Sequence, residues 1–310
     1  MYVFPVLSKN AWKVLLTLTE QPCQASEIAK KTGLGLNRVV EALDQLEKYN
    51  IIPSRKRKMI ITFDSSLRST LKDLLTEYHK EILVDSFEGK KLNTLFQILD
   101  GYDTIAKLKL VTDYSTPTLK RITDRLQRKL FIFQPKKGIY HIRNAFKPQI
   151  KLLYSSFFAH YSDLLEKQGI TWKKIKLFGS AVLIESNQDS IPGFVRTSFS
   201  RFHEYKVELF LTSYNYFIND DKEQSKEEIF IHALADSAQD YRQMMYCTLF
   251  ADLNKLTLKQ LKNLPIIFRV ENEAKQIFDY LVSNGKTKSK NDFLTPYNEY
   301  LEVRGNYARY

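Results

Sequence analysis

The chain has 310 residues. A single domain usually has ~100–200 residues, so this length predicts two or three domains. Its 44% hydrophobic and 26% charged residues exclude a disordered or collagen-like protein, and no apolar stretch reaches the ~18 residues of a membrane-spanning helix. The N-terminal residues lack the features of a secretory signal. Cys23 and Cys247 make no metal-ligand spacing and fit a reducing compartment. We therefore expect a cytoplasmic protein with no metal, no cofactor and no membrane contact.

The positive charge is concentrated in the first half of the chain. The net charge of +12 divides into 28 basic and 17 acidic residues over 1–168, against 19 and 18 over 169–310. Lysines that serve only solubility would be spread evenly. The uneven spread predicts that the first half binds a polyanion. The abundance of Tyr and Phe (18 and 20) with only 10 Gly is typical of an AT-rich prokaryotic genome, an archaeal one included.

The first half also contains an internal repeat. Shifting the chain by 80 residues aligns apolar positions without a gap, although few residues are identical. The aligned pairs are Leu15 with Leu95, Leu16 with Phe96, Leu18 with Ile98, Ile28 with Leu108, Leu46 with Leu126, Ile51 with Phe131 and Ile60 with Tyr140. The repeat predicts two copies of one fold, and the alternative is a chance match of abundant apolar residues.

The first copy, residues 8–63, reads as three helices and a hairpin. Glycines at its centre supply a tight turn between the second and third helices. Its elements in chain order are a helix capped by Ser8, a short helix over 27–32 capped by Ser26, the turn Gly33-Leu34-Gly35, a helix over 36–49, and strands at 51–52 and 59–63 around the tip Arg55-Lys56-Arg57-Lys58.

The second copy, residues 92–143, repeats this order. Pro117 falls in the first turn of its third helix, where proline is favoured. Its elements are a helix over 92–99 ended by Gly101, a helix capped by Asp103, a helix over 118–129 capped by Ser115 or Thr116, and strands at 131–133 and 139–142 around Lys136-Lys137-Gly138.

A further helix is expected after each copy, over 66–83 and over 148–165. Each can pack onto its own copy. The second is apolar around more of its circumference than a surface helix needs. We therefore expect it to form an interface with the C-terminal domain or with a partner chain.

Two stretches of the first copy carry a family resemblance. Residues 24–33 read QASEIAKKTG, residues 37–47 read NRVVEALDQLE, and the basic hairpin follows directly. This pattern resembles the winged helix-turn-helix regulators of the MarR-like and ArsR-like kind, over 8–63 well and over 92–143 less well. The second copy departs from the family where Asp113-Tyr114-Ser115 replaces the usual glycine-containing turn. The resemblance implies a transcriptional regulator with tandem winged helices.

This layout assigns the residues that contact double-stranded DNA. The major groove, ~12 Å wide, admits one helix, whose early exposed side chains reach base edges, and a basic hairpin tip contacts phosphates. The candidates are Asn37, Arg38, Glu41, Arg55, Lys56, Arg57 and Lys58 in the first copy, and Thr118, Lys120, Arg121, Arg125, Lys136 and Lys137 in the second. The alternative is that winged helices serve here as a protein-interaction scaffold and that their arginines are merely solvated.

The second half changes pattern near Gly169, where strands are followed by helices, which predicts an α+β domain. The expected strands are 175–178, 181–184, 194–199 and 205–212, and the expected helices are 225–235, opened by a capping box of Ser225 and Glu228, then 240–254, 257–263 and 270–283. A basic winged helix followed by such a domain loosely resembles the AbiEi-type antitoxins, which autoregulate their operons.

Catalytic motifs are sparse. Phe178-Gly179-Ser180 invites comparison with minimal nucleotidyltransferases, but no carboxylate pair follows on a strand, and Glu185 and Glu208 are isolated. Such phosphoryl transfer needs carboxylates to hold its metal. His203 and His232 have no ligand partners at suitable spacing, and phosphate-loop, dinucleotide-binding and hydrolase motifs are absent. We expect that the protein is not an enzyme and has no catalytic residues.

The predicted architecture is α+β, with winged-helix domains over 1–86 and 87–168, each with its trailing helix, and an α+β domain over 169–310. We expect a sequence-specific DNA-binding transcriptional regulator, with the last domain serving homodimerisation, a protein partner or an effector. The alternatives are an interaction scaffold or antitoxin-like autoregulator and, less favoured, a divergent nucleotidyltransferase.

Overall fold

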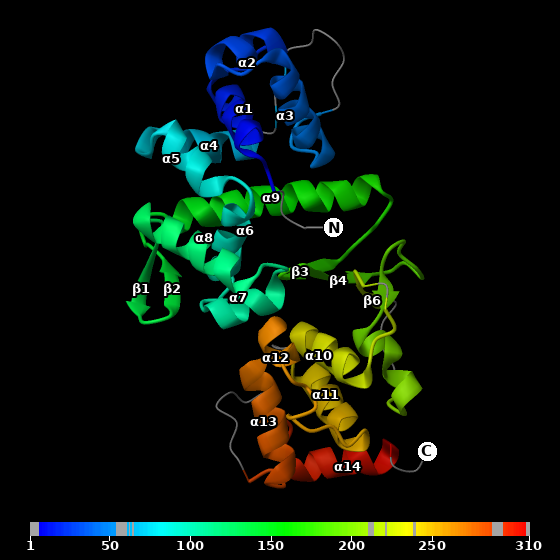
Figure 1. Cartoon of the computed structure of the whole chain (residues 1–310). Coiled ribbons are helices and arrows are strands. Elements are labelled where there is room, and N and C mark those ends of the chain that lie inside the picture. The colour runs from blue at the N-terminus through cyan, green and yellow to red at the C-terminus, as the bar shows by residue number, and fades with distance from the viewer. Residues whose placement is uncertain are drawn as a thin grey trace. The chain divides into compact units, whose positions relative to one another are not determined.

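The computed structural model describes residues 6–53, 61, 63, 65–209, 214–220, 222–237, 240–286 and 294–307. The chain divides into two compact units, Met1–Gly169 and Ile170–Tyr310. In its described residues the first unit is helical with one hairpin, and the second combines an antiparallel sheet with helices (Figure 1). The α+β class is therefore confirmed.

Three helices open the first unit: α1 over Lys9–Glu20, α2 over Ala25–Thr32 and α3 over Leu36–Lys48. Ser8 caps α1 as predicted, because its hydroxyl accepts a hydrogen bond from Ala11 N at 3.2 Å. The predicted cap of α2 at Ser26 is wrong. Gln24 takes that position, since Glu27 Oε2 accepts a hydrogen bond from Gln24 N at 2.9 Å and the helix begins earlier.

The same arrangement returns 80 residues later. The elements are α6 over Lys90–Leu99, α7 over Ile105–Val111, α8 over Thr116–Arg128, β1 over Ile132–Lys136 and β2 over Ile139–Ile142, the last two paired antiparallel. The start of α2 and both ends of α3 recur at a shift of 80 residues in α7 and α8. The predicted cap of α7 is wrong, because Thr104 accepts from Lys107 N, and Asp103 instead pairs with Lys107 at 3.3 Å.

The end of the third helix is repeated in detail. Asn50 and Leu130, at equivalent positions, both have a left-handed backbone, with φ of 56° and 64°. The next N–H then returns to the helix, Ile51 to Leu46 O at 2.9 Å and Phe131 to Leu126 O at 3.0 Å. This turn directs the chain inward, so residues 51–52 form a buried bend and not the predicted strand. Ile61 bridges to Cys23, while most of the predicted first hairpin lies outside the described residues.

The helix expected over 66–83 is two helices, α4 over Ser65–Glu77 and α5 over Lys80–Phe87. The break falls at Tyr78 and His79. His79 has an extended backbone (φ −58°, ψ 136°), and Tyr78 stacks on Phe146 with ring centroids 4.5 Å apart. The break therefore coincides with an aromatic contact to the second copy, and helical periodicity alone does not reveal it. The trailing helix of the second copy, α9, covers Lys147–Lys167.

One aromatic core joins both copies. The ring of Trp12 in α1 lies 5.4 Å from Phe87 in α5 and 6.4 Å from Phe157 in α9. Phe157 in turn lies 6.2 Å from Phe96 in α6. All four side chains are buried. The part of α9 that carries Phe157 is therefore covered within the first unit, against the helices of both copies, and is not available as the predicted interface.

The sheet of the second unit has the order β3-β4-β6-β5, with all neighbours antiparallel. Its strands are β3 over Lys174–Phe178, β4 over Ala181–Ser186, β5 over Val195–Arg196 and β6 over Asn215–Ile218. The predicted strand over 194–199 is shorter because a 3-10 helix, η1 over Ser198–Tyr205, follows it. The strand predicted from residue 205 is wrong over 205–209, where Lys206 is left-handed (φ 62°) and turns the chain. The sheet uses β6 instead.

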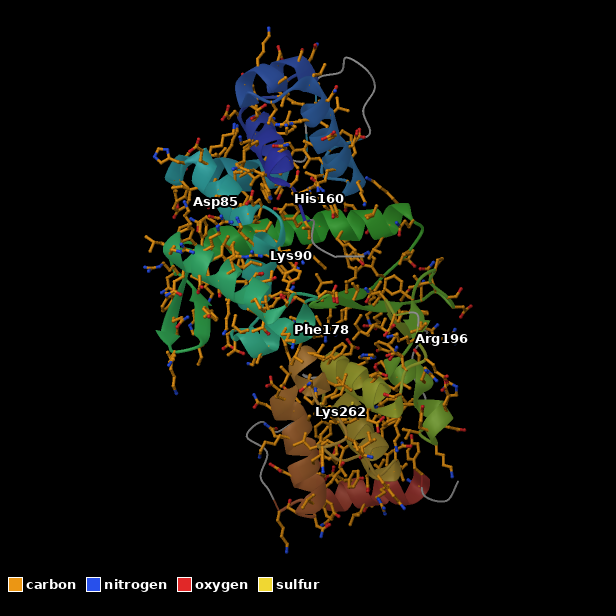
Figure 2. The ribbon with its side chains drawn as sticks, viewed as in Figure 1. Asp85, Lys90, His160, Phe178, Arg196 and Lys262 are labelled. Carbon is orange, nitrogen blue, oxygen red and sulfur yellow. The ribbon has the colours of Figure 1, made fainter. Side chains whose placement is uncertain are left out.

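The helices of the second unit are α10 over Lys226–Ser237, α11 over Tyr241–Leu253, α12 over Leu264–Ile267, α13 over Glu271–Val282 and α14 over Tyr297–Tyr307. The capping box is confirmed, with Ser225 N donating to Glu228 Oε2 at 2.8 Å and Glu228 N to Ser225 Oγ at 3.3 Å. The helix predicted over 257–263 is wrong, since these residues form turns. The sequence also missed α14. Phe178 lies at the end of β3 (Figure 2). Its ring packs against that of Phe268 in the core, with centroids 5.0 Å apart.

Candidate nucleic-acid interface

Helix α8 has one buried and one basic face. Ser115 caps it, and Pro117 lies in the first turn as expected. Leu119, Ile122 and Leu126 are buried where α8 packs against α6 and α7. Helical periodicity therefore turns the remaining positions toward solvent. The exposed charged side chains are Lys120, Arg121, Asp124, Arg125 and Arg128, which give α8 a net charge of +3.

Three candidates on α8 are available for binding. In the part of the chain that the structure describes, Lys120, Arg121 and Arg125 have no acidic partner, whereas Lys129, just after the helix, lies 3.8 Å from Asp85. Thr118 differs from them, because its hydroxyl lies 2.9 Å from Ser115 Oγ and it is only half exposed. Thr118 thus belongs to the helix cap and is the least suited of these candidates to reach a base.

The hairpin of β1 and β2 carries two further candidates and packs beside α8 (Figure 1). Phe133 pairs with His141, and the register shifts before Lys136 pairs with Ile139. Gly138 closes the tip with φ of 81°, a conformation that glycine adopts without strain. Lys136 and Lys137 are both exposed. We call Lys120, Arg121, Arg125, Lys136 and Lys137 the α8–hairpin group.

The turn before α8 is held by a tyrosine. Asn93 Nδ2 in α6 donates to Tyr114 Oη at 3.0 Å, and Lys90 Nζ lies 4.3 Å from the Tyr114 ring centroid. No residue of 112–115 has a positive φ, whereas Gly33 in the first copy has φ of 68°. The departure from the usual glycine turn is therefore compensated by a buried side chain that anchors this turn to α6.

Helix α3 presents a different surface, although its candidates Asn37, Arg38 and Glu41 are all exposed. With two basic and three acidic residues, α3 has a net charge of −1. Leu36 and Val40 are also 53% and 40% exposed. Acidic charge repels phosphate, and exposed apolar side chains are more typical of a protein contact. The remaining candidates of this copy, Arg55, Lys56, Arg57 and Lys58, lie outside the described residues.

Sequence reasoning left out two exposed basic residues near the α8–hairpin group. Arg128 lies one helical turn beyond Arg125, with its Nε 3.4 Å from Asp124 O, and Arg143 follows β2 directly. The spacing of three residues from Arg125 is a signal that could have identified Arg128. For Arg143 no local pattern exists, because its place depends on the hairpin pairing.

Two of the titratable groups singled out in the second unit, His232 and Glu185, have partners within that unit. His232 Nδ1 lies 2.6 Å from Thr197 Oγ1, and burial lowers the pKa of His232 to about 3. Gly179 and Ser180 join β3 directly to β4, where Glu185 pairs with Lys173 at 2.9 Å. His203 is exposed. Across the described ranges, no three His, Cys, Asp or Glu residues are grouped so as to hold a metal ion.

Comparison of the chain with family models, curated proteins and solved structures found no match. Within the described residues, no helix has the length and apolar character needed to cross a bilayer.

Proposed function

We propose that the first unit binds double-stranded DNA through the α8–hairpin group and that the protein is a transcriptional regulator. The observation that supports this best is the collection of five exposed basic side chains on two adjacent elements, with no acidic partner for the three on α8 in the described part of the chain. A helix fits the major groove, and lysines at a hairpin tip reach phosphates. The order of three helices and a hairpin supports the winged-helix interpretation of this copy.

The proposal gives the two copies different roles. Helix α8 has a net charge of +3 and α3 one of −1, so the electrostatic attraction to phosphate acts mainly on the second copy. Arg121 is the residue best placed to read a base, since it is exposed within the first two turns after the N-cap Ser115. Lys136 and Lys137 would hold the backbone.

The second unit is assigned dimerisation, partner binding or effector sensing, and no reaction. Both cysteines are free and buried, and we infer a reducing cytoplasm as the place of action.

The decisive experiment is a titration of labelled duplex DNA with the full chain at several salt concentrations. The double variant Arg121→Ala/Arg125→Ala should lose at least tenfold in affinity at low salt. Arg38→Ala/Lys48→Ala on α3 removes the same charge and should change the affinity less than twofold. A larger loss in the α3 variant would move the interface to the first copy, and no salt-dependent affinity in the parent protein would contradict DNA binding.

A second function is favoured for the first copy by the exposed Leu36 and Val40 on an acidic helix. In this second function, α3 contacts a partner protein, and the winged helices serve as an interaction scaffold. If the parent protein has no affinity for duplex DNA while its fold is intact, this function becomes the primary one.

A further inference from the structure

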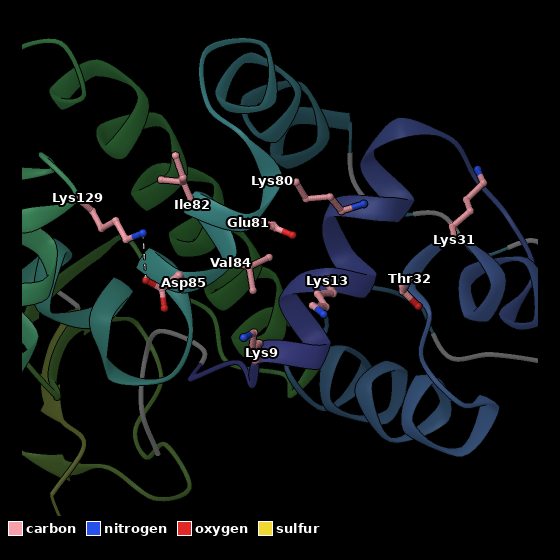
Figure 3. A pocket seen from close by; sticks show the side chains of 10 residues that line it. All are labelled: Lys9, Lys13, Lys31, Thr32, Lys80, Glu81, Ile82, Val84, Asp85 and Lys129. Atoms are coloured by element: carbon pink, nitrogen blue, oxygen red, sulfur yellow. Dashed lines mark ion pairs between the residues drawn. The ribbon is translucent and has the colours of Figure 1, made fainter.

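A pocket of about 530 Å³ in the first unit is lined by five lysines (Figure 3). They come from different elements of both copies. Lys9 and Lys13 belong to α1, Lys31 to α2, Lys80 to α5, and Lys129 follows α8. Two acidic residues, Glu81 and Asp85, also line the pocket. The lining therefore has a formal net charge of +3.

The ion pairs of the lining lysines leave three of them without an acidic partner among the described residues. The carboxylate of Asp85 lies 3.6 Å from the Nζ atom of Lys91 and 3.8 Å from that of Lys129. Lys91 does not line the pocket, so the negative charge of Asp85 is shared with a lysine outside it. Lys80 pairs with Glu20 at 3.4 Å, but Glu20 is 52% exposed and such a surface pair contributes little. Lys9, Lys13 and Lys31 have no acidic partner among the described residues.

The positions of two lysines are also unfavourable for the helix that carries them. Lys9 begins α1, where the positive end of the helix dipole opposes a cation, and no acidic residue lies in that first turn. Lys13 follows one turn later, at the i,i+4 spacing where like charges repel. Stability alone does not account for this arrangement, whereas an anion in the pocket would relieve it.

We propose that this pocket binds a small molecule that carries two or more linked phosphate groups. Lysine ammonium groups bind phosphate as point charges. The volume falls in the range of small-ligand sites, ~300–1,000 Å³, and Ile82 and Val84 add an apolar wall. Figure 3 shows Lys31 toward one end of the lining and Lys129 toward the other, with Lys9, Lys13 and Lys80 between them. A chain of phosphates would meet several of these ammonium groups at once.

The test uses calorimetric titration of the full chain with tripolyphosphate at low salt, beside ATP and orthophosphate. Tripolyphosphate should bind saturably and at least tenfold more tightly than orthophosphate. ATP binding as tightly as tripolyphosphate would identify nucleotides as one source of the phosphate chain, and weaker ATP binding would identify the free oligophosphate; both support the site.

The triple variant Lys9→Gln/Lys13→Gln/Lys31→Gln should weaken tripolyphosphate binding at least tenfold, and Lys31→Gln alone severalfold. The control is Lys72→Gln/Lys147→Gln/Lys151→Gln, which removes three exposed lysines of the same unit outside the pocket and should change binding less than twofold. Circular dichroism establishes that each variant is folded, and the single variant is the readout if the triple one is not. Equal weakening in both triples, or no saturable binding, overturns the proposal. The proposal is also overturned if the pocket triple variant loses as much affinity for duplex DNA as it loses for tripolyphosphate, because the lysines would then belong to a DNA-binding surface.

Discussion

Glu41 and Arg121 occupy the same position in the two copies, 80 residues apart, and carry opposite charges on exposed helix surfaces. The backbones of α3 and α8 correspond at both ends, so the difference lies in the side chains alone. One residue earlier, the exposed Val40 of α3 corresponds to the exposed Lys120 of α8. A duplicated helix thus presents two chemically different faces.

This pair gives a reciprocal prediction. Arg121→Glu should lower affinity for duplex DNA at least tenfold at low salt, because it places an acidic group in the proposed interface. Glu41→Arg should leave the affinity unchanged or make it tighter. Anisotropy titrations of both variants on one duplex are the measurement. A larger effect from Glu41→Arg than from Arg121→Glu would contradict the assignment to α8.

The hairpin tip should act through phosphates and not through bases. Lys136→Ala/Lys137→Ala is expected to weaken binding to all duplexes alike and to reduce the log–log salt slope by about 0.9 for each phosphate that the variant no longer neutralises. The companion variant replaces Arg55, Lys56, Arg57 and Lys58 by alanine and measures the contribution of the first tip. If the slope stays constant in the Lys136/Lys137 variant, that tip does not touch DNA.

The aromatic core should hold the two copies together. Trp12→Ala removes the ring that contacts Phe87 and Phe157 and should cost about 3–5 kcal/mol of stability. Hydrogen exchange should then speed up in α1 and in α6, since both copies depend on this core, while the second unit is unaffected. Trp172→Ala, in the second unit, is the control. Faster exchange confined to the first copy would show that the copies are stable independently.

His232 predicts a pH dependence of stability. Its pKa in the folded protein, about 3, lies below its ordinary value of 6.5, so the unfolded chain binds the proton more tightly. Its contribution is complete above pH 6.5 and is lost as pH falls toward 3, at up to ~1.4 kcal/mol per pH unit. His232→Asn keeps an acceptor for Thr197 and should flatten this dependence in urea unfolding measured at several pH values. Parallel curves for the two proteins would show that His232 does not titrate in this way.

The two glycines of the α2–α3 turn should respond differently to alanine. Gly33 is left-handed, with φ of 68°, and Gly35 is extended, with φ of −62°; a Cβ at either position would meet no atom within 4 Å. Gly33→Ala forces an alanine into the left-handed region and should cost about 1–2 kcal/mol. Gly35 is the N-cap of α3, where alanine is less favourable than glycine, so Gly35→Ala should cost about 0.5 kcal/mol, as measured by thermal unfolding. Equal losses would show that this strain is not the dominant effect.

The sequence predicted the helices of the first unit well, because buried apolar positions recur at both the helical period and the 80-residue shift. It misplaced the caps of α2 and α7. Gln24 caps α2 in place of the predicted Ser26, and Thr104 caps α7 in place of the predicted Asp103. It joined α4 to α5, because the contact of Tyr78 with Phe146 links residues 68 apart in the chain. It also predicted a strand from residue 205, where the turn at Lys206 interrupts an otherwise strand-like alternation, and it missed β6 over Asn215–Ile218.

For the candidate site, the sequence correctly indicated basic residues of α8 and of its hairpin that are exposed. It also predicted that α3 and α8 contact DNA bases in the same way. The contrast became clear only when exposure and pairing were known together. The sequence alone does not show that Val40, next to the buried Val39 in α3, is exposed. The lysine-lined pocket could not be found from sequence, because Lys31 and Lys129 are 98 residues apart and come to line one pocket only through the packing of the two copies.

The shared core around Trp12 and Phe157 has a consequence for how the two exposed helices can change over time. Helix α3 packs against α1 and α8 against α6, and α1 and α6 each supply a ring to this core. Substitutions on the outer surface of either helix therefore leave these rings unchanged. Each surface can therefore acquire a separate specificity while the geometry that relates them is inherited unchanged. A macromolecule that engages both helices would meet two surfaces whose chemistry differs but whose supporting helices share one aromatic interior.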